Sequence, residues 1–172
     1  MIELFNFVLI TNPKFVIRNQ RELKINWNIK HYSKLTINEF HDLIQLRISA
    51  FVVEQNCPYQ ELDGKDKNSF HLIALNEHNH LVATARILPK GISYSNDVAI
   101  GRVVISPNYR MNKIGHQLMQ ECLNFIDSQF GAVSVRISAQ KHLENYYAQH
   151  HFVSTGKEYL EDNIPHVEML KY

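Results

Sequence analysis

Cysteine is scarce in this chain, with only Cys57 and Cys122 among its 172 residues. One falls in a predicted loop, and the other occupies an apolar position of a predicted helix. Two cysteines placed in this way do not indicate a disulfide framework. A reduced, cytoplasmic setting is therefore the expectation.

An excess of either charge is also missing. Lys and Arg number 18 against 17 Asp and Glu, which leaves a net charge of +1 at pH 7. This balance creates no whole-molecule field that would attract nucleic acid or an anionic membrane. We expect neither as a partner, and any bound anion must be held by a local arrangement of residues.

No apolar run is long enough to span a bilayer. The stretch from Ile2 to Ile10 carries Glu3 and Asn6, and it lacks a basic flank and a small-residue cleavage site. We expect neither a signal peptide nor a membrane helix. A chain of this length with 45% hydrophobic residues suits one domain. We place it at residues 24–172, after an N-terminal extension of open role at residues 1–23.

Hydrophobic periodicity predicts alternating strands and helices. Thr36 and Glu39 form a capping-box pattern, after which apolar residues recur at three- or four-residue spacing from Ile37 to Phe51. We predict strands at residues 24–30, 70–75, 81–88, 99–105, 133–139, 152–159 and 166–171, and helices at about 37–51, 113–129 and 142–150.

The order of these elements predicts a mixed α/β (α+β) fold. Hairpins join neighbouring antiparallel strands, whereas the two strand–helix–strand units are not expected to join strands of that kind. A largely antiparallel sheet follows. The first helix runs into a long loop, whose acidic residues would suit a cationic amine unless they are merely solvated. These residues are Glu54, Glu61, Asp63 and Asp66.

The segment from Arg110 to Gly115 lies between a predicted strand and a predicted helix. Backbone N–H groups at a helix N-terminus are unpaired donors that favour phosphate. Arg110 and Lys113 add two cations, and Gly115 removes a side chain where a ligand could come close. The pattern predicts a pyrophosphate site, although an ordinary loop with a surface Arg and Lys is the alternative for this segment alone.

The residues from Gly101 to Met119 resemble the coenzyme A motif of the GNAT N-acetyltransferases, whose loop reads Arg or Gln, two residues, Gly, one residue, Gly. Four further blocks resemble the ElaA-like branch of that superfamily. They are residues 51–59 (with Asp63 and Asp66), 70–72, 85–89 and 161–166. The likeness spans about residues 24–172.

The resemblance implies a GNAT fold with a splayed central strand pair, acetyl-CoA as cosubstrate, and direct transfer to a primary amine of a small molecule or peptide. In that family the strand before the loop splays at a bulge and its backbone pairs with the pantetheine arm. The implied cofactor-binding residues are Val103, Val104, Ile105, Arg110, Met111, Asn112, Lys113, Ile114, Gly115, His116 and Asn145.

Three positions depart from the family pattern, because Lys113, His151 and Asn163 stand where the family has Gly. Lys113 is tolerable if its N–H points inward at helical φ, and its ammonium could meet a phosphate. A weaker or reshaped site is the alternative. Asn and His are among the residues that accept positive φ, so both turns stay plausible.

Direct acyl transfer needs a neutral amine, a stabilised oxyanion and a proton for the departing thiolate. Tyr147 falls on the family's general acid, and a tyrosine with the usual pKa of about 10 is protonated at neutral pH. Packing of the short helix is the alternative role. The candidate bases are Glu54, His71, His166 and Glu168, each of which could instead be structural, and water could relay the proton.

Two functions remain open. The first is an amine N-acetyltransferase, and the second is a non-catalytic coenzyme A-sensing module, which Lys113 keeps in play. Dinucleotide binding would need a Gly-rich loop near Ile29 to Ser33, where there is no glycine. The ten histidines form no compact set with a cysteine at structural zinc spacing, so no metal is expected. The acceptor amine and the oligomeric state stay open, with a homodimer as one option.

Overall fold

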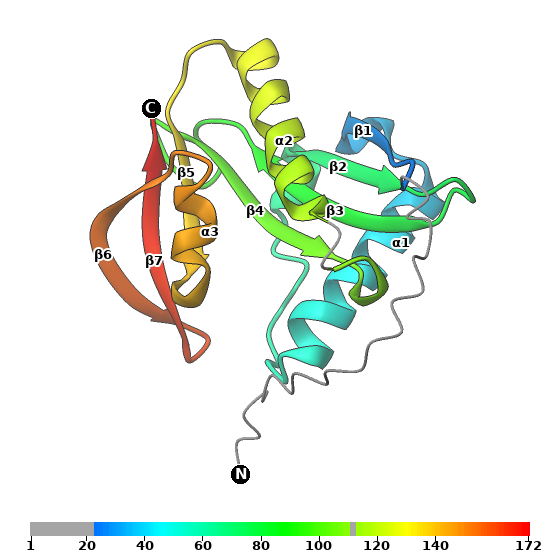
Figure 1. Ribbon diagram of the computed structural model, residues 1–172, viewed down its shortest axis with the longest axis horizontal. Helices are drawn as coiled ribbons and strands as arrows, with labels where there is room; N and C mark the ends of the chain where they lie inside the picture. Colours follow the sequence, from blue (N-terminus) through cyan, green and yellow to red (C-terminus); the bar gives the residue numbers. More distant parts are fainter. Residues whose placement is uncertain (1–22, 111–112) are drawn as a thin grey trace, which may run out of the picture.

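The computed structural model describes residues 23–110 and 113–172. All of the predicted extension except Leu23 lies outside these residues, as do Met111 and Asn112. One sheet of seven strands runs in the order β1-β2-β3-β4-β5-β7-β6 (Figure 1). The strands are β1 Asn26–His31, β2 Phe70–Leu75, β3 Leu81–Leu88, β4 Val98–Ile105, β5 Val135–Gln140, β6 Val153–Glu161 and β7 Ile164–Lys171.

In the part of the chain that the structure describes, three α-helices flank the sheet: α1 Ile37–Arg47, α2 Ile114–Phe130 and α3 Glu144–Ala148. A π-helical segment, Ile48–Glu54, continues α1, and short 3-10 turns occupy Tyr32–Lys34, Lys65–Asn68, Pro107–Tyr109 and Lys141–Leu143. In the view of Figure 1, α2 lies in front of β3 and β4 while α1 lies behind them. The predicted mixed fold with flanking helices is confirmed.

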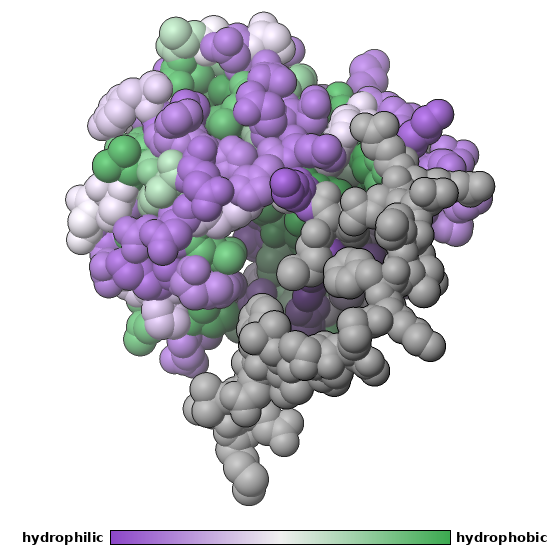
Figure 2. Space-filling view, in the orientation of Figure 1, coloured by the Kyte–Doolittle hydropathy of each residue, from purple (hydrophilic) through white to green (hydrophobic). Residues whose placement is uncertain are grey.

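The sheet splits at its centre. Every strand pair is antiparallel except β4 with β5, which are parallel and joined only at Val98 with Val135 and Ala99 with Arg136. Beyond Ala99 the two strands diverge, which is the predicted splayed central pair. Figure 2 shows a mostly hydrophilic front face with a recess between the two halves, in which both hydrophobic and hydrophilic residues are visible.

The first strand–helix–strand unit differs from the prediction. β1 and β2 are antiparallel neighbours, with Asn26 opposite Leu75 and His31 opposite Phe70. The chain leaves β1, passes down α1 and returns through the long loop, so β2 starts at the end of the sheet where β1 stopped. The loop therefore reverses the direction that a single crossover helix would give.

The first helix begins as predicted, with the Thr36–Glu39 capping box formed. Its buried face is different from the predicted apolar stripe, however. Ile37 is 88% exposed, while Leu43, Arg47 and Ala50 are buried. Arg47 can occupy a core position of this helix because it pairs with the buried carboxylates of Glu61 and Asp66 in the loop that follows.

The core lies between α2 and the centre of the sheet. Ile114, Leu118, Cys122 and Ile126 recur at four-residue spacing and are at most 2% exposed. They pack on strand residues such as Leu72 and on the rest of the buried cluster. Gly131, at φ 73°, ends the helix in a conformation that suits glycine. This packing fixes the start of α2 beside the end of β4.

Candidate functional site

A cleft of about 690 Å³ opens where β4 and β5 separate. One wall comes from β4 and the loop after the π-helix, and the other comes from β5, β6, β7 and α3. Contacts across the cleft include a hydrogen bond that Gln140 donates to Gln55 at 3.2 Å and one that the Cys57 thiol donates to the Asp162 carbonyl at 3.9 Å. Both halves of the sheet therefore contribute to the cleft.

Strand alternation makes the second wall polar. Residues two apart on a strand point to the same face. The intervening side chains Ala139, Val167 and Met169 are buried in the core. The polar residues of the wall are Arg136, Ser138 and Gln140 of β5, Lys157, Tyr159 and Glu161 of β6, and His166 and Glu168 of β7.

The first wall contains a bulge in β4. Thr84 pairs with Val104 and Arg86 with Gly101, so Arg102 and Val103 stand opposite Ala85 alone. Arg102 has φ 52°, a left-handed conformation that is uncommon for residues other than Gly. The structure therefore has a bulge where the family resemblance implied one.

The three β4 residues predicted to bind cofactor differ from one another in their surroundings. Val103 lines the cleft, whereas Val104 is 6% exposed and Ile105 packs partly buried against the core. Since β4 pairs with β5 no further than Ala99, the β5-facing backbone groups beyond it lack a strand partner. That free edge is what a pantetheine amide needs.

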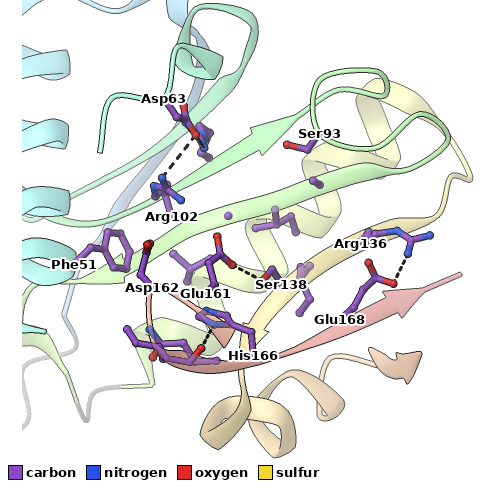
Figure 3. A pocket seen from close by; sticks show the side chains of 18 of the residues that line it. Phe51, Asp63, Ser93, Arg102, Arg136, Ser138, Glu161, Asp162, His166 and Glu168 are labelled. Atoms are coloured by element: carbon purple, nitrogen blue, oxygen red, sulfur yellow. Dashed lines mark hydrogen bonds and ion pairs between the residues drawn. The ribbon is translucent and has the colours of Figure 1, made fainter. Parts of the chain in front are cut away.

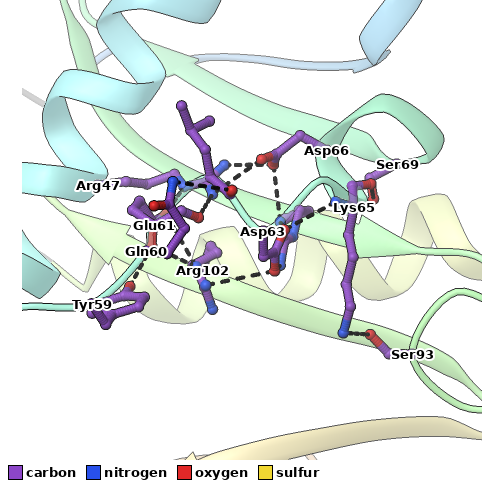
Figure 4. Close-up of polar contacts among 12 residues, drawn as sticks. Arg47, Tyr59, Gln60, Glu61, Asp63, Lys65, Asp66, Ser69, Ser93 and Arg102 are labelled. Carbon is purple, nitrogen blue, oxygen red and sulfur yellow. Dashed lines mark hydrogen bonds and ion pairs between the residues drawn. The ribbon is translucent and has the colours of Figure 1, made fainter. Parts of the chain in front are cut away.

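An ionic network holds the bulge from behind (Figure 4). Glu61 accepts hydrogen bonds from Arg102 at 2.9 and 3.1 Å and a further bond from Arg47. Arg47 also donates to Asp66 at 2.7 Å. The Arg102 guanidinium lies 5.5 Å from the centre of the Tyr59 ring. Glu61 and Arg47, 4% and 1% exposed, thereby fix the one strained residue of β4.

The long loop is therefore not an acidic surface. Arg86 donates to Asp63 at 2.7 Å and to Asp66 at 3.0 Å. Burial alone would raise the pKa of Asp63, but the hydrogen bonds of Arg86 hold it at about 2. Glu61, Asp63 and Asp66, which the sequence offered for a cationic amine, are therefore paired with arginines, and Glu61 and Asp66 are buried as well.

Glu54, which does not line the cleft, is also paired with an arginine. The Arg110 guanidinium donates to both its oxygens, at 2.6 and 2.7 Å, in a solvent-exposed pair. Hydrogen bonds from Arg110 lower the pKa of Glu54, which makes it a poor proton acceptor. The Nε of Arg110 also donates to the Ile105 carbonyl at 3.2 Å. The two predicted site residues thus contact each other.

Lys113 adopts φ 57° and ψ 10°, which is left-handed and not the helical conformation expected. The physical reason is that the chain must turn from the loop into α2, a turn that glycine makes without a side-chain clash. His116 and Gln117 are the first amides bonded to the Lys113 carbonyl. Helix geometry leaves the amides of Ile114 and Gly115 without intrahelical acceptors, as a phosphate site requires.

The lack of a side chain at Gly115 makes room for neighbouring side chains of the protein. A Cβ there would lie 3.1 Å from the Tyr146 hydroxyl and 3.2 Å from Ile105 Cδ1. The Tyr146 hydroxyl donates to the Gly115 carbonyl at 2.7 Å. His116, another predicted cofactor residue, has its Nδ1 at 2.9 Å from His150 Nε2. These contacts tie the start of α2 to α3.

Tyr147 lies on α3, 8% exposed, and lines the cleft. Burial raises its pKa to about 12, so the hydroxyl keeps its proton at neutral pH. Asn145, on the same helix, is exposed. His151 after α3 has φ 66° and Asn163 has φ 65°, which confirms that these residues serve where the family has glycine.

Among the candidate bases, His166 has the most suitable placement. It lines the cleft, and its Nδ1 donates to the Ile164 carbonyl at 2.8 Å, which leaves Nε2 as the acceptor in the neutral ring. Glu168 is held by Arg136 at 2.7 Å. His71 is fully buried, and burial lowers its pKa to about 4. Its Nε2 bonds the Asp66 carbonyl, so its role is structural.

Sequence reasoning missed Arg102, Ser138 and Tyr159. The alternation of residues 133–139 indicated that Ser138 faces away from the core, but it could not indicate what Ser138 faces. Within residues 23–110 and 113–172, no group of three or more His, Cys, Asp or Glu side chains could hold a metal ion. No helix in that part of the chain is both long and apolar enough to cross a membrane.

Comparisons with known proteins fit this geometry. The family model described as Acetyltransferase (GNAT) domain matches residues 30–172. Protein ElaA of Escherichia coli strain K12 is 40% identical over 149 residues, covering 86% of this chain and 96% of that protein. The crystal structure of an acyl-CoA N-acyltransferase from Pseudomonas aeruginosa matches with TM-score 0.82 and 41% identity, covering 87% of this chain and 100% of that one. For the crystal structure of Escherichia coli ElaA the TM-score is 0.81 at 38% identity, with 87% and 100% covered.

Proposed function

The chain belongs to the GNAT acetyltransferase family, and from that premise we propose that it transfers an acetyl group from acetyl-CoA directly to a primary amine of a small molecule or peptide. Use of an acyl-CoA donor follows from the family, whereas the acetyl group and the amine are the proposal. The observation that carries it is the cleft, where Tyr147 and His166 line one hollow beside the bulged edge of β4.

The residues present suit an acyl-CoA. The β4 edge beyond Ala99 offers backbone groups to the pantetheine arm, and the amides of Ile114 and Gly115 offer donors to the pyrophosphate. Lys113 adds positive charge at the same end of α2, where the charge of Arg110 is paired with Glu54. When bound, the donor supplies a thioester carbonyl, and the remaining chemistry belongs to the protein side chains.

Tyr147 is the proposed general acid. As the amine nitrogen bonds to the carbonyl carbon, the carbon–sulfur bond breaks and the sulfur takes the Tyr147 proton. The new amide nitrogen then returns a proton to the phenolate oxygen. A hydroxyl whose pKa burial has raised to about 12 is protonated throughout the neutral range, and it regains its proton readily.

His166 is the proposed proton acceptor for the incoming ammonium. Its Nδ1–H donates to the Ile164 carbonyl, so Nε2 carries the lone pair. The ring also lies parallel to that of Tyr159, at 17° with centroids 6.1 Å apart. These contacts orient the imidazole before an amine arrives.

Thiol release from acetyl-CoA, measured across a panel of primary amines, tests the proposal. The expected result is amine-dependent release with one new N-acetyl product by mass spectrometry. The non-catalytic coenzyme A sensor is the second candidate, favoured by the strained Lys113 and the Arg110–Glu54 pair. A rise in melting temperature with acetyl-CoA, without turnover of any amine, would support the sensor and refute the transferase.

The domain limits and the compartment remain part of the proposal. Residues 24–172 would form the catalytic domain, which the family match from residue 30 supports. Cys57 and Cys122 are both free and buried, which suits a reducing, cytoplasmic setting.

A further inference from the structure

Glu161 is the last residue of β6 and lines the cleft. Asp162 and Asn163, with φ 49° and 65°, connect β6 to β7. Two consecutive positive φ values make a two-residue hairpin turn, which pairs Glu161 with Ile164. Glu161 therefore points to the same face as Tyr159, two residues earlier, and both line the cleft.

A chain of hydrogen bonds ends on this carboxylate. The Tyr159 hydroxyl donates to Ser138 Oγ at 2.6 Å, and Ser138 donates to Glu161 Oε2 at 3.0 Å. Figure 3 shows Glu161 directed towards Ser138 in the middle of the lining. Both donors are neutral hydroxyls, so they orient the carboxylate without neutralising its charge.

Two of the other three carboxylates that line the cleft are already neutralised, and the third, Asp162, belongs to the exposed turn after β6. Asp63 is paired with Arg86 and Glu168 with Arg136, each at 2.7 Å. Among the described residues, no Lys or Arg forms an ion pair with Glu161. Its negative charge is thus oriented towards the cleft and available to a cation from outside the protein.

Glu161 is also well placed relative to the proposed proton acceptor. His166 lies opposite Tyr159 across the β6–β7 ladder, so it is the diagonal neighbour of Glu161. The Cα atoms of diagonal neighbours lie about 7 to 8 Å apart, so one small group between the two side chains can contact both. An ammonium held by Glu161 can therefore also reach the His166 ring.

We propose that Glu161, oriented by Ser138 and Tyr159, binds the acceptor as a primary alkylammonium and presents it to His166. This rests on the proposed transferase function and names its substrate class. The ammonium gives one proton to His166 Nε2, and the neutral amine keeps its contact with Glu161 through a remaining N–H. Glu161 touches the substrate, whereas Ser138 and Tyr159 are positioning residues.

Steady-state thiol release with acetyl-CoA and n-butylamine, cadaverine or spermidine tests the role of Glu161. Glu161→Gln should raise KM for the best amine about tenfold or more, because one charge-assisted contact is lost. Affinity for acetyl-CoA should stay within about twofold. Glu158→Gln is the matched control, since it removes the same charge from the opposite face of β6, where Glu158 binds Lys141 at 2.6 Å.

The positioning step has its own test. Ser138→Ala should raise the amine KM by about threefold with kcat nearly unchanged, and Ser138→Thr should restore it because the hydroxyl returns. Melting temperatures of all variants check the fold. An unchanged amine KM in Glu161→Gln, or an equal rise in Glu158→Gln, would overturn the assignment. A wild type that acetylates other primary amines of the panel but none of these three would overturn the alkylammonium assignment alone, whereas no turnover of any amine would refute the transferase function itself.

Discussion

Tyr147 shows how one side chain can be both packed and reactive. It is 8% exposed and contacts Phe152 edge-on, yet it lines the cleft. Its neighbour Tyr146 instead bonds the Gly115 carbonyl. The adjacent tyrosines therefore have different contacts: Tyr146 binds the start of α2, and Tyr147 lines the cleft.

Removal of the Tyr147 hydroxyl tests the general acid. Tyr147→Phe should slow amine-dependent thiol release about a hundredfold, because general acid catalysis typically contributes that much. Acetyl-CoA affinity, measured by calorimetry, should change little. Tyr146→Phe is the matched variant and should weaken stability or cofactor binding but not kcat. Full activity in Tyr147→Phe would remove the assigned role.

His71 gives a pH prediction at the same scale. Burial lowers its pKa from 6.5 to about 4, so the folded protein holds the ring neutral while the unfolded chain protonates it. Stability from this residue is complete above pH 6.5 and is lost as the pH falls towards 4. By linkage the loss is about 3 kcal/mol.

Urea unfolding at several pH values measures this effect. His71→Gln lacks the titrating group, so its stability should vary less between pH 6.5 and 4 than that of the wild type. His150, whose pKa burial also lowers, is present in both proteins and cancels in the comparison. Parallel pH curves for the two proteins would show that His71 is not held neutral.

Helix α2 shows how an element can be well formed and begin under strain. Its buried stripe and its Gly131 end follow the sequence pattern, but Lys113 at its start has φ 57°. A residue with a Cβ pays about 1 kcal/mol or more for that conformation. The packing of α2 against β3 and β4 holds Lys113 in this conformation.

Substitution at Lys113 separates backbone strain from charge. Lys113→Gly should raise the free energy of unfolding by about 1 kcal/mol, whereas Lys113→Ala, which keeps the strain, should not. If the ammonium contacts phosphate, both variants bind acetyl-CoA more weakly by a similar factor. Equal stability of the Gly and Ala variants would show that the left-handed turn costs nothing here.

At the scale of the whole molecule, the cleft exists because the sheet is divided. Two residue pairs join β4 to β5, and further contacts, such as Gln140 to Gln55 and the Cys57 thiol to the Asp162 carbonyl, cross the opening between the walls. A ligand in the cleft would contact both halves. It would therefore stabilise the region where the sheet itself is weakest.

Hydrogen exchange can detect that stabilisation. Saturating acetyl-CoA should slow exchange of the β4 amides beyond Ala99 about tenfold or more, because they gain acceptors and their local opening is suppressed. β2, paired on both sides by β1 and β3, serves as the internal control and should change little. Protection confined to β2, or absent from β4, would contradict binding along this edge.

The local sequence determined the elements and predicted the segments that form the candidate cofactor site. Alternation, helical spacing and the Thr36–Glu39 cap act within a few residues, so the hairpin of residues 70–75 and 81–88 was predicted to the residue. The family pattern placed Tyr147 and the start of α2. Those features rest on neighbours in the chain, which a sequence displays directly.

The tertiary structure alone decided which charges are available. Arg47 meets Glu61 and Asp66, Arg110 meets Glu54, and Arg136 meets Glu168, over sequence separations that no local pattern encodes. Strand order set the rest, since β7 lies between β5 and β6 and brings Ser138, Tyr159 and His166 to one wall. Ion pairing and register depend on where distant strands meet. The sequence could therefore offer many acids and histidines, and only the folded sheet shows which of them face the cleft.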